Sequence, residues 1–364
     1  MTKSDESDRR FLRRAVHLAG KGRGRVHPNP QVGCVIVRGG RVVGEGWHAQ
    51  FGGAHAEPTA LKQAGSKAKG STAYVTLEPC CYQGKTPPCT EALIAAGVSR
   101  VVASLKDPNP RVAGRGFARL RKAGIRVTAG LLQEEASVLI AEFVFWLKHR
   151  RPRVILKAAA SLDGRIETAS KQSKWITSAQ ARAASRRMRG DVDAILTGVD
   201  TVIADDPRLT ASRGRSPLRV ILDSRLRSPR SARVFSGNTP TLVATSAAPK
   251  TAVSGRSNVA WLKIPRKRNG LDLKTLLKRL ADLGVARLLI EGGSKIHSSF
   301  LDAGLVDEIR LFLSPRLIGG ESARTFYEGR GARDLSDSLR LQNPTVKKIG
   351  PDFLISGALR RGAR

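Results

Sequence analysis

The sequence has few cysteines, no long apolar run and no apolar stretch at its start. Only 4 of its 364 residues are cysteines, all in the first quarter of the chain, which is too few and too clustered for a disulfide scaffold. This usage predicts a reduced cytoplasmic protein in which some thiols act as ligands. The most apolar stretch, Val138–Leu147, has ten residues and contains Glu142, so it is too short to span a membrane. Residues 1–10 lack the apolar region of a signal peptide.

Acidic residues are also scarce relative to basic ones. The chain has 64 Lys and Arg against 30 Asp and Glu, a formal net charge of +34, and such a chain is attracted to polyanions. However, the basic residues are spread along the chain and aromatic residues make up only 5%, so no basic stripe is interleaved with stacking platforms for bases. We therefore expect phosphorylated small molecules as partners and consider nucleic acid unlikely as the main one.

Length and periodicity predict two α/β domains. Apolar residues make up 41% of the chain, enough for a core in each of two domains of roughly 150 residues or more. Helical and strand-like patterns alternate in both halves, and the polar segment His149–Pro152 separates them. We expect domains at residues 1–149 and 150–364. The segment Ser246–Asn258 is polar and rich in small residues, and it predicts a loop.

The clearest chemical pattern lies in the first half. His55 and Glu57 stand at the start of an expected helix over Ala54–Ala64, and Cys80 and Cys89 follow an expected strand. One imidazole and two thiolates form a zinc site that keeps its fourth position for water. Zinc lowers the pKa of that water, and a carboxylate beside it can pass its proton to a leaving amine. The pattern predicts hydrolytic deamination of a nucleobase-like ring, with His55, Cys80 and Cys89 as metal ligands and Glu57 as the catalytic residue.

Further motifs surround these residues. In chain order they are His27-Pro28-Asn29-Pro30-Gln31-Val32-Gly33, Gly44-Glu45-Gly46-Trp47-His48, the His-Ala-Glu triplet at 55–57, and Glu78 through Cys89 ending in Gly84-Lys85-Thr86-Pro87-Pro88-Cys89. In these motifs the chain resembles the bifunctional riboflavin-biosynthesis deaminase/reductase, in which eight residues between the two cysteines are the rule. The resemblance implies that Asn29 and His48 line the pocket for the base, and that Lys85 and Thr86 contact the substrate.

The chain departs from that family pattern beside the first zinc cysteine. The family usually has Ser-His there, whereas this chain has Cys81-Tyr82. Tyr82 removes an imidazole that donates to substrate, so one alternative is a protein that has lost deamination and kept its reductase or a binding role. A second alternative, suggested by the charge, is a deaminase of RNA or DNA that flips its base. We expect Cys34 and Cys81 to be bystanders.

The resemblance continues from Arg153 to about Gly350. Its motifs are Leu156-Lys157-Ala158-Ala159-Ala160-Ser161-Leu162-Asp163-Gly164-Arg165, Ser173-Lys174-Trp175-Ile176-Thr177, the segment Gly198–Leu209 and Glu291-Gly292-Gly293-Ser294. It implies a dihydrofolate-reductase-like domain that binds NADPH without a G-x-G-x-x-G fingerprint. Independently, an apolar strand that runs into two glycines and a helix lets backbone N–H groups approach a phosphate.

The resemblance also assigns residues to the reductase site. It places NADPH near Ala159, Trp175, Thr201, Asp205, Ser224, Gly293, Ser294, Lys295, Ile296, His297, Ser298 and Ser299. It places the reductase substrate near Ser173, Arg189, Leu209, Arg213 and Glu291, the match at Arg213 being shifted by one residue. The guanidinium of Arg189 suits a phosphate because its fork binds bidentately. The proton donor stays open between Asp205 and a bound water.

Together these observations predict one two-headed enzyme of riboflavin biosynthesis. The expected fold is α/β, with an N-terminal cytidine-deaminase-like α/β/α domain and a C-terminal dihydrofolate-reductase-like α/β domain. The expected reactions are zinc-dependent deamination of 2,5-diamino-6-(5-phosphoribosylamino)pyrimidin-4-one and NADPH reduction of its ribosyl side chain to the ribitylamino product. The family further implies a homodimer or homotetramer.

Overall fold

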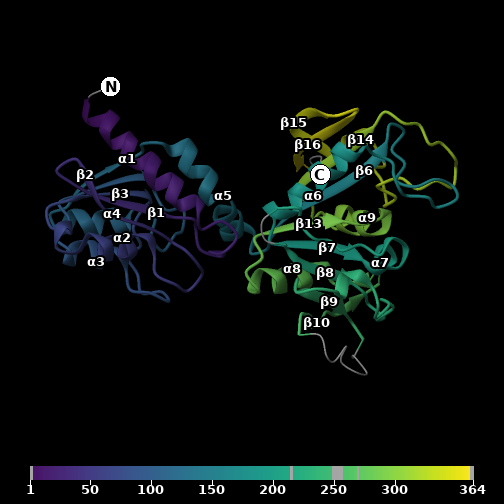
Figure 1. Cartoon of the computed structure of the whole chain (residues 1–364), viewed down its shortest axis with the longest axis horizontal. Helices are drawn as coiled ribbons and strands as arrows, with labels where there is room; N and C mark the ends of the chain where they lie inside the picture. The colour runs from purple at the N-terminus through teal and green to yellow at the C-terminus, as the bar shows by residue number, and fades with distance from the viewer. Residues whose placement is uncertain (1–2, 214–215, 248–256, 269, 361–364) are drawn as a thin grey trace. The chain divides into compact units, whose positions relative to one another are not determined.

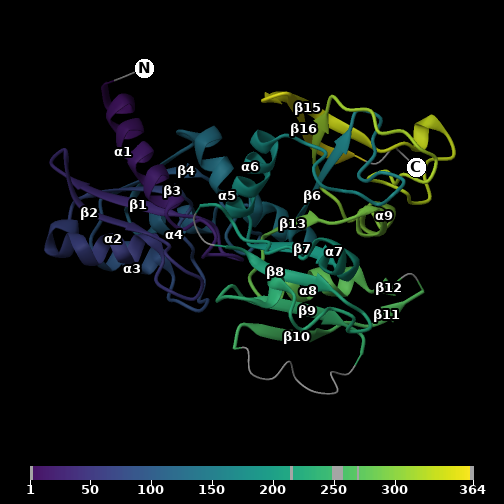
Figure 2. The same cartoon turned by 45° about the vertical axis from the view of Figure 1, so that its right-hand side comes forward.

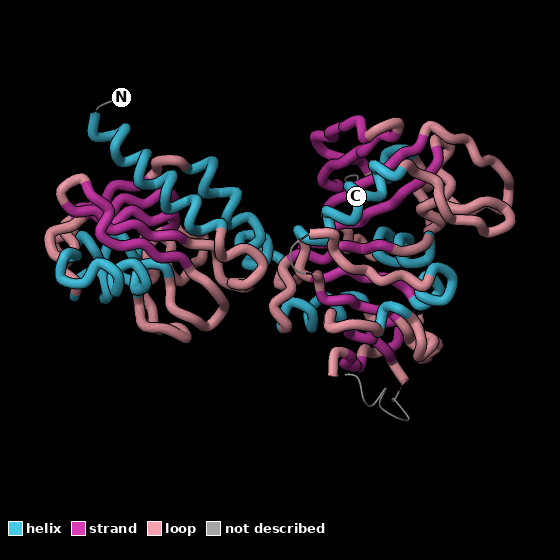
Figure 3. Tube along the Cα trace, in the orientation of Figure 1, coloured by secondary structure: helices cyan, strands magenta, loops and turns pink. Residues whose placement is uncertain are grey.

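The computed structural model describes residues 3–213, 216–247, 257–268 and 270–360. It divides the chain into two compact units, Met1–Arg150 and Arg151–Arg364 (Figure 1). Most of the loop expected at Ser246–Asn258 lies outside the described residues. Both units mix helices and strands, which confirms the α/β class (Figure 3). Within the described residues no helix combines the length and apolarity needed to cross a bilayer.

The first unit is a five-stranded sheet between two layers of helices. Its helices are α1 (Lys3–Gly20), α2 (Ala56–Ala64), α3 (Cys89–Ala95), α4 (Arg115–Lys122) and α5 (Gln133–His149), with a 3-10 turn η1 (Gly65–Ala68). Its strands are β1 (Gly33–Arg38), β2 (Arg41–Trp47), β3 (Thr72–Leu77), β4 (Arg100–Leu105) and β5 (Arg126–Ala129). The strand order is β2-β1-β3-β4-β5. β1 runs antiparallel to β2 and β3, whereas β3, β4 and β5 are parallel.

Alternation along the strands divides the apolar side chains of this unit between two cores. Ile36 and Val75 point into a core that they share with α2, α3 and α4, and Val35 and Tyr74 point into the core under α1. Period-2 alternation places neighbouring residues of a strand on opposite faces, so both faces are covered. The expected α/β/α layering follows. It leaves the first turns of α2 and α3 side by side at the end of β3.

The second unit is built on a nine-stranded mixed sheet (Figure 2). Its helices are α6 (Ala179–Met188), α7 (Val199–Asp205), α8 (Leu273–Asp282) and α9 (Ser294–Asp302), with 3-10 turns η2 (Arg189–Asp191), η3 (Arg233–Phe235) and η4 (Leu335–Asp337). Its strands are β6 (Arg153–Ser161), β7 (Ala194–Gly198), β8 (Leu218–Leu222), β9 (Thr241–Thr245), β10 (Val259–Lys263), β13 (Arg287–Glu291), β14 (Glu308–Ser314), β15 (Arg340–Ile349) and β16 (Asp352–Arg360). The short strands β11 (Arg266–Lys267) and β12 (Gly270–Leu271) pair separately.

Strands β10, β9, β8, β7, β13, β6 and β14 lie side by side in that order and are all parallel, and β16 and β15 continue the sheet antiparallel. α8 and α9 cover one face, where Leu156 and Ile290 point, and α7 covers the other, where Ile155 and Leu289 point. In open α/β sheets, ligands bind beyond the carboxyl ends of the parallel strands. That edge carries the motif residues after β7, β8 and β13.

Candidate functional site

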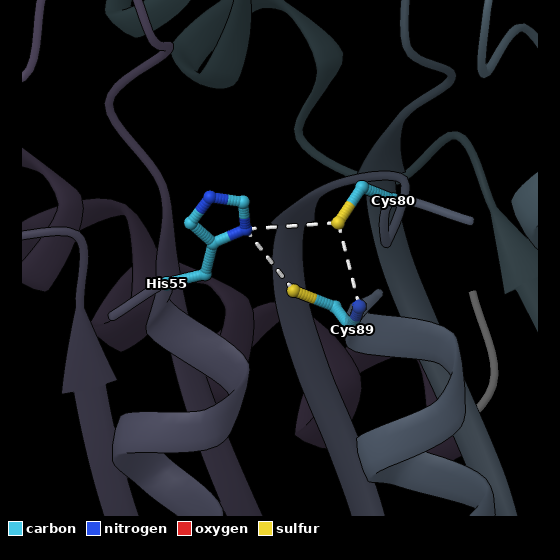
Figure 4. A group of neighbouring side chains, drawn as sticks. All are labelled: His55, Cys80 and Cys89. Carbon is cyan, nitrogen blue, oxygen red and sulfur yellow. Dashed lines mark hydrogen bonds between the residues drawn. The ribbon is translucent and has the colours of Figure 1, made fainter. Parts of the chain in front are cut away.

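Three candidate metal ligands meet where the first unit brings two helix starts to the end of β3. His55 is the N-cap of α2, Cys89 is the first residue of α3, and Cys80 lies in the loop after β3. His55 Nδ1 lies 3.2 Å from Cys89 Sγ and 3.6 Å from Cys80 Sγ (Figure 4). The Cys89 amide donates to Cys80 Sγ at 3.3 Å. The three ligand atoms lie within 4.8 Å of one another.

This geometry fits a tetrahedral zinc ion. Zinc bonds of roughly 2.0–2.1 Å to nitrogen and 2.3 Å to sulfur put the ligand atoms of a tetrahedron about 3.5 Å apart, close to the separations of His55 from both sulfurs. The pKa of Cys80 is lowered to about 4, first by the hydrogen bond from the Cys89 thiol and then by His55 and the Cys89 amide. A thiolate, the form that binds metal, is therefore favoured at Cys80.

Glu57 lies in the first turn of α2, beside this ligand group. It is only 3% exposed, and its Oε2 has no hydrogen-bond partner in the part of the chain that the structure describes. Burial, and then the nearby Cys80 sulfur, raise the pKa of Glu57 to about 7. A buried carboxyl group that titrates near neutrality and has a free oxygen is suited to take up and return a proton.

Of the four residues expected at the deaminase substrate, three connect to His55. His48 donates from Nδ1 to the Ala54 carbonyl at 3.0 Å, so its Nε2 accepts from the Asn29 amide at 3.1 Å. The His48 ring stands edge-on to the His55 ring at 5.1 Å, and Thr86 Oγ1 lies 3.3 Å from His55 Nε2. These contacts orient the imidazole of the candidate ligand His55 from both sides.

The fourth residue, Lys85, is separate from this network. It is exposed, and its ammonium group lies 4.1 Å from the centre of the Phe51 ring. An exposed cation on an aromatic face keeps its charge available to solvent or to an anion.

The sequence did not predict two residues that contact the loop carrying Cys80. Glu78 is buried, and its carboxylate accepts hydrogen bonds from the amides of Asp107, Gly114 and Phe117. It therefore ties the strand end that precedes Cys80 to the segment leading into α4. In the sequence, the only indication of this structural role is an acidic residue directly before the Pro79-Cys80 pair.

The second missed partner is Arg111. Its guanidinium carbon lies 4.0 Å from the centre of the Tyr82 ring, and its carbonyl oxygen is 4.0 Å from the Cys81 sulfur. Tyr82, where the family usually has histidine, thus stacks with a cation from the 106–114 loop. Nothing local in the sequence indicates this pairing.

In the second unit, the glycine motif opens α9. Gly293 is the N-cap of the nine-residue helix and has open space where a Cβ would stand. The adjacent Ser294 is 1% exposed, and no described residue forms a hydrogen bond with its hydroxyl group. Free backbone donors and an unpartnered hydroxyl at a helix start suit a phosphate group. Gly198, the last residue of β7, lets α9 come close, because a Cβ there would lie 2.8 Å from the side chain of Ile296.

Other expected cofactor residues occupy the same edge. Ala159 lies on β6, Thr201 on α7 and Ser224 just beyond β8. Trp175 is 61% exposed, with the Arg182 guanidinium 4.4 Å from its ring centre. Asp205 accepts from the Ser173 hydroxyl at 3.3 Å, and its carbonyl accepts from Lys174 at 3.2 Å.

The later residues of the α9 segment take part in packing. The buried His297 bonds through Nδ1 to the Phe326 carbonyl, and Ser298 accepts from the Glu328 amide. Ser299 donates back to Lys295 within the helix, and Lys295 pairs with Asp200 at 3.3 Å. Only the first turn of α9 therefore presents free donors at the strand edge.

The expected substrate residues fall into two groups. Arg189 donates from Nε and Nη2 to the two oxygens of Glu291 at 2.9 and 2.8 Å, and Lys157 lies 3.8 Å from the same carboxylate. Burial opposes ionisation of Glu291, but the charges of Lys157 and Arg189 outweigh it and lower its pKa to about 2. The guanidinium group of Arg189, which was expected to hold a phosphate, thus binds the carboxylate of Glu291.

The remaining three substrate candidates do not join that ion pair, and Ser173 donates to Asp205 instead. Leu209 is buried in the core under α7. Arg213 is exposed, and it lines a cavity of about 360 Å³ together with Ala183, Arg186, Arg187 and Ser212. Arg213 therefore takes no part in the ion pair between Arg189 and Glu291.

Comparisons with known proteins match both units. The RibD C-terminal domain family matches residues 152–355, and the cytidine and deoxycytidylate deaminase zinc-binding region matches residues 5–105. The riboflavin biosynthesis protein RibD of Escherichia coli is 42% identical over 366 residues, covering 96% of this chain and 98% of that protein. The RibD protein of Aquifex aeolicus is 41% identical over 360 residues, with the same coverage.

Solved structures agree over the full length. A structure of Acinetobacter baumannii RibD superposes with a TM-score of 0.83 at 37% identity, covering 98% of this chain and 100% of that one. A deaminase/reductase structure from Thermotoga maritima gives a TM-score of 0.79 at 36% identity, covering 98% and 99%.

Proposed function

This chain belongs to the RibD family of riboflavin biosynthesis proteins, and on that premise we propose which reactions it performs and which residues carry them. It is a bifunctional enzyme with a zinc-binding deaminase region and an NADPH-dependent reductase domain. We assign deamination to residues 1–149 and reduction to residues 150–364. The positions of the two family matches, 5–105 and 152–355, support this division.

The proposed first substrate is 2,5-diamino-6-(5-phosphoribosylamino)pyrimidin-4-one. Hydrolytic deamination forms a carbon–oxygen bond at the ring carbon, breaks the bond to its exocyclic amine and releases ammonia. In the proposed second reaction NADPH would supply a hydride for the ribose C1 of the imine form, and Asp205 or a bound water would deliver a proton to the imine nitrogen, which yields the ribitylamino product and NADP⁺. The Thermotoga maritima relative is described by these two activities.

The proposal for the deaminase site stands on one observation. The ligand atoms of His55, Cys80 and Cys89 converge within 4.8 Å beside Glu57, whose Oε2 has no hydrogen-bond partner among the described residues. A zinc ion held by these three residues would supply an activated water at neutral pH. The carboxylate of Glu57 would take up a proton from the attacking water and return it to the departing amine. Asn29 and Thr86 orient the imidazoles that face the base, and Lys85 offers a charge for the phosphate.

The proposal for the reductase site stands on the carboxyl edge of the parallel strands. Gly293 and Ser294 present donors for a cofactor phosphate at the start of α9. Trp175, Thr201 and Ser224 complete the proposed NADPH-binding edge, and the other cofactor candidates lie around it. Asp205, held by Ser173, faces this edge as a polar group for the substrate. The hydride chemistry belongs to the cofactor, and the protein supplies orientation and charge.

A combined metal and activity measurement tests this function. We expect about one zinc per chain, deamination that requires it, and saturable NADPH binding on the same polypeptide. Cys80→Ser should lose zinc and deamination but keep reduction. Cys81→Ser is the matched control, because this neighbouring thiol lies outside the ligand group, and it should keep its zinc. A zinc-free chain that deaminates at full rate would contradict the proposal.

We place the enzyme in the cytoplasm, as a homodimer or homotetramer that does not depend on nucleic acid. Its four cysteines are free thiols, which suits a reducing compartment. Light scattering tests the oligomeric state. A mobility-shift assay at physiological salt tests nucleic acid, and tight saturable RNA binding without NADPH binding would favour the nucleic-acid alternative.

A further inference from the structure

Two loops leave the carboxyl edge of the nine-stranded sheet side by side. One loop, residues 162–172, follows β6, and the other, residues 315–330, follows β14 (Figure 1). β6 and β14 are parallel neighbours. Their pairing continues into the loops, because the Leu162 amide donates to the Arg316 carbonyl at 2.7 Å. Long loops in a compact domain are commonly functional, so the contacts between these two bear on what the edge does.

Asp163 joins the two loops where they leave the sheet. Its carboxylate accepts hydrogen bonds from the Ile318 amide at 3.1 Å, the Gly319 amide at 2.7 Å and the Ser161 hydroxyl at 2.5 Å. The bond from Ser161, and then the two amide bonds, lower the pKa of Asp163 to about 2. The group is therefore a carboxylate at neutral pH, and its charge-assisted bonds are stronger than bonds to a neutral acceptor.

Further bonds fasten the two loops together beyond this point. The Ile166 amide donates to the Arg324 carbonyl at 2.8 Å, and Arg324 Nε lies 3.3 Å from the Glu167 carboxylate. Arg165 and Thr325 form an antiparallel backbone bridge. The carboxylate bonds thus stand at the start of a paired stretch that runs away from the sheet.

Each loop reaches one side of the proposed NADPH site. The loop after β6 leads to Trp175, an expected cofactor contact. The loop after β14 binds α9, because His297 Nδ1 donates to the Phe326 carbonyl at 3.0 Å and the Glu328 amide donates to the Ser298 hydroxyl at 2.9 Å. The position of Trp175 relative to the first turn of α9 therefore depends on how the two loops are joined.

We propose that Asp163 is a positioning residue of the reductase, which joins the two loops and thereby keeps Trp175 aligned with the first turn of α9 for NADPH binding. This inference rests on the proposed reductase function. Asparagine has one acceptor oxygen and an NH₂ group in place of the other, so Asp163→Asn leaves one of the two loop amides without its acceptor. The substitution also removes a negative charge, which by itself favours an anionic cofactor. Weaker NADPH binding in this variant therefore reports lost positioning.

NADPH titration and reductase kinetics of the full-length enzyme test the proposal. For Asp163→Asn we expect the Kd and the KM for NADPH to rise about five- to tenfold, with kcat at saturating NADPH within about threefold of the wild-type value. In the cofactor-free enzyme, the backbone amides of residues 316–325 should exchange hydrogen faster in the variant. Deamination by the same chain should keep its wild-type rate, because these loops belong to the second unit.

Asp334→Asn is the matched control. Asp334 is exposed after the same loop, and its side chain forms no cap hydrogen bond with η4, so its substitution removes the same charge without loosening the loops. It should leave the Kd for NADPH unchanged. An unchanged Kd in Asp163→Asn, or an equal rise in both variants, would overturn the proposal. So would a lower kcat with an unchanged KM, because that result reports fewer folded molecules. A wild-type enzyme that binds no NADPH would instead refute the proposed function.

Discussion

Arg111 places its guanidinium carbon 4.0 Å from the centre of the ring of Tyr82, which stands two residues after the candidate zinc ligand Cys80. Tyr82 therefore joins the loop that carries Cys80 to the loop formed by residues 106–114. Cation–π contacts of this kind contribute roughly 0.5–1 kcal/mol at exposed sites. The residue that departs from the family pattern thus has a structural partner of its own.

Substitution of Tyr82 tests whether this departure impairs deamination. We expect Tyr82→Phe to keep the stacking and the deaminase rate, and Tyr82→His to change kcat by less than about tenfold, a limit of about 1.4 kcal/mol. Deaminase kinetics with zinc content measured in parallel check this. A sharp increase in Tyr82→His alone would show that the native tyrosine had cost the enzyme its deaminase activity.

Glu57→Gln should separate the two activities. The amide cannot accept and return a proton, so deamination should fall by about 10²–10⁴-fold. Zinc content should stay the same, because Glu57 is outside the ligand group, and reduction should be unaffected. Metal analysis and both rates on one preparation check this. Deamination at the wild-type rate would remove Glu57 from the chemistry.

Glu78→Gln should destabilise the first unit without removing a metal ligand. The buried carboxylate accepts three backbone hydrogen bonds, and weakening charge-assisted bonds at a buried site costs on the order of 1–3 kcal/mol. Glu91→Gln is the control, because Glu91 is exposed and only pairs with Arg119 on the surface. Denaturant unfolding followed in the first unit should show a clear shift for Glu78→Gln only. Equal shifts for both variants would show that the backbone hydrogen bonds to Glu78 do not stabilise the first unit.

Acid should destabilise the second unit in two steps. Burial lowers the pKa of His297 to about 4, whereas an unfolded histidine titrates near 6.5. Below that pH the unfolded chain binds a proton that the folded chain excludes, so stability falls as pH drops from about 6.5 to about 4. The pKa of Glu291 is about 2 when folded, so its contribution is lost from about 4.3 down to about 2.

His297→Asn isolates the first of these steps. The amide can replace Nδ1 as donor to the Phe326 carbonyl, and it does not titrate. Urea unfolding of the full chain at pH 7 and pH 5 should show a smaller loss of stability in the variant than in the wild type. An identical pH dependence in both proteins would show that His297 is not the group excluded from protonation.

The prediction from sequence succeeded where local pattern carries the information. The apolar run before Glu291 and the glycines after it predict a strand and a helix start, and β13 and α9 lie there. The hairpin of β15 and β16 was missed, because almost every side chain of β15 is exposed and its pattern has no apolar alternation. Helix α7, inside the motif Gly198–Leu209, was not expected as a helix either.

The α/β class and the candidate ligands His55, Cys80 and Cys89 follow from the amino-acid sequence alone, because periodicity and short spacings act within a few residues. The side chains that these residues contact follow from the packing of the folded chain. That packing paired Arg189 with Glu291 across 102 positions of the chain, stacked Arg111 on Tyr82, and gathered Arg213 with the last turn of α6. These contacts depend on how strands and helices pack, and packing brings together residues whose separation along the chain carries no local signal.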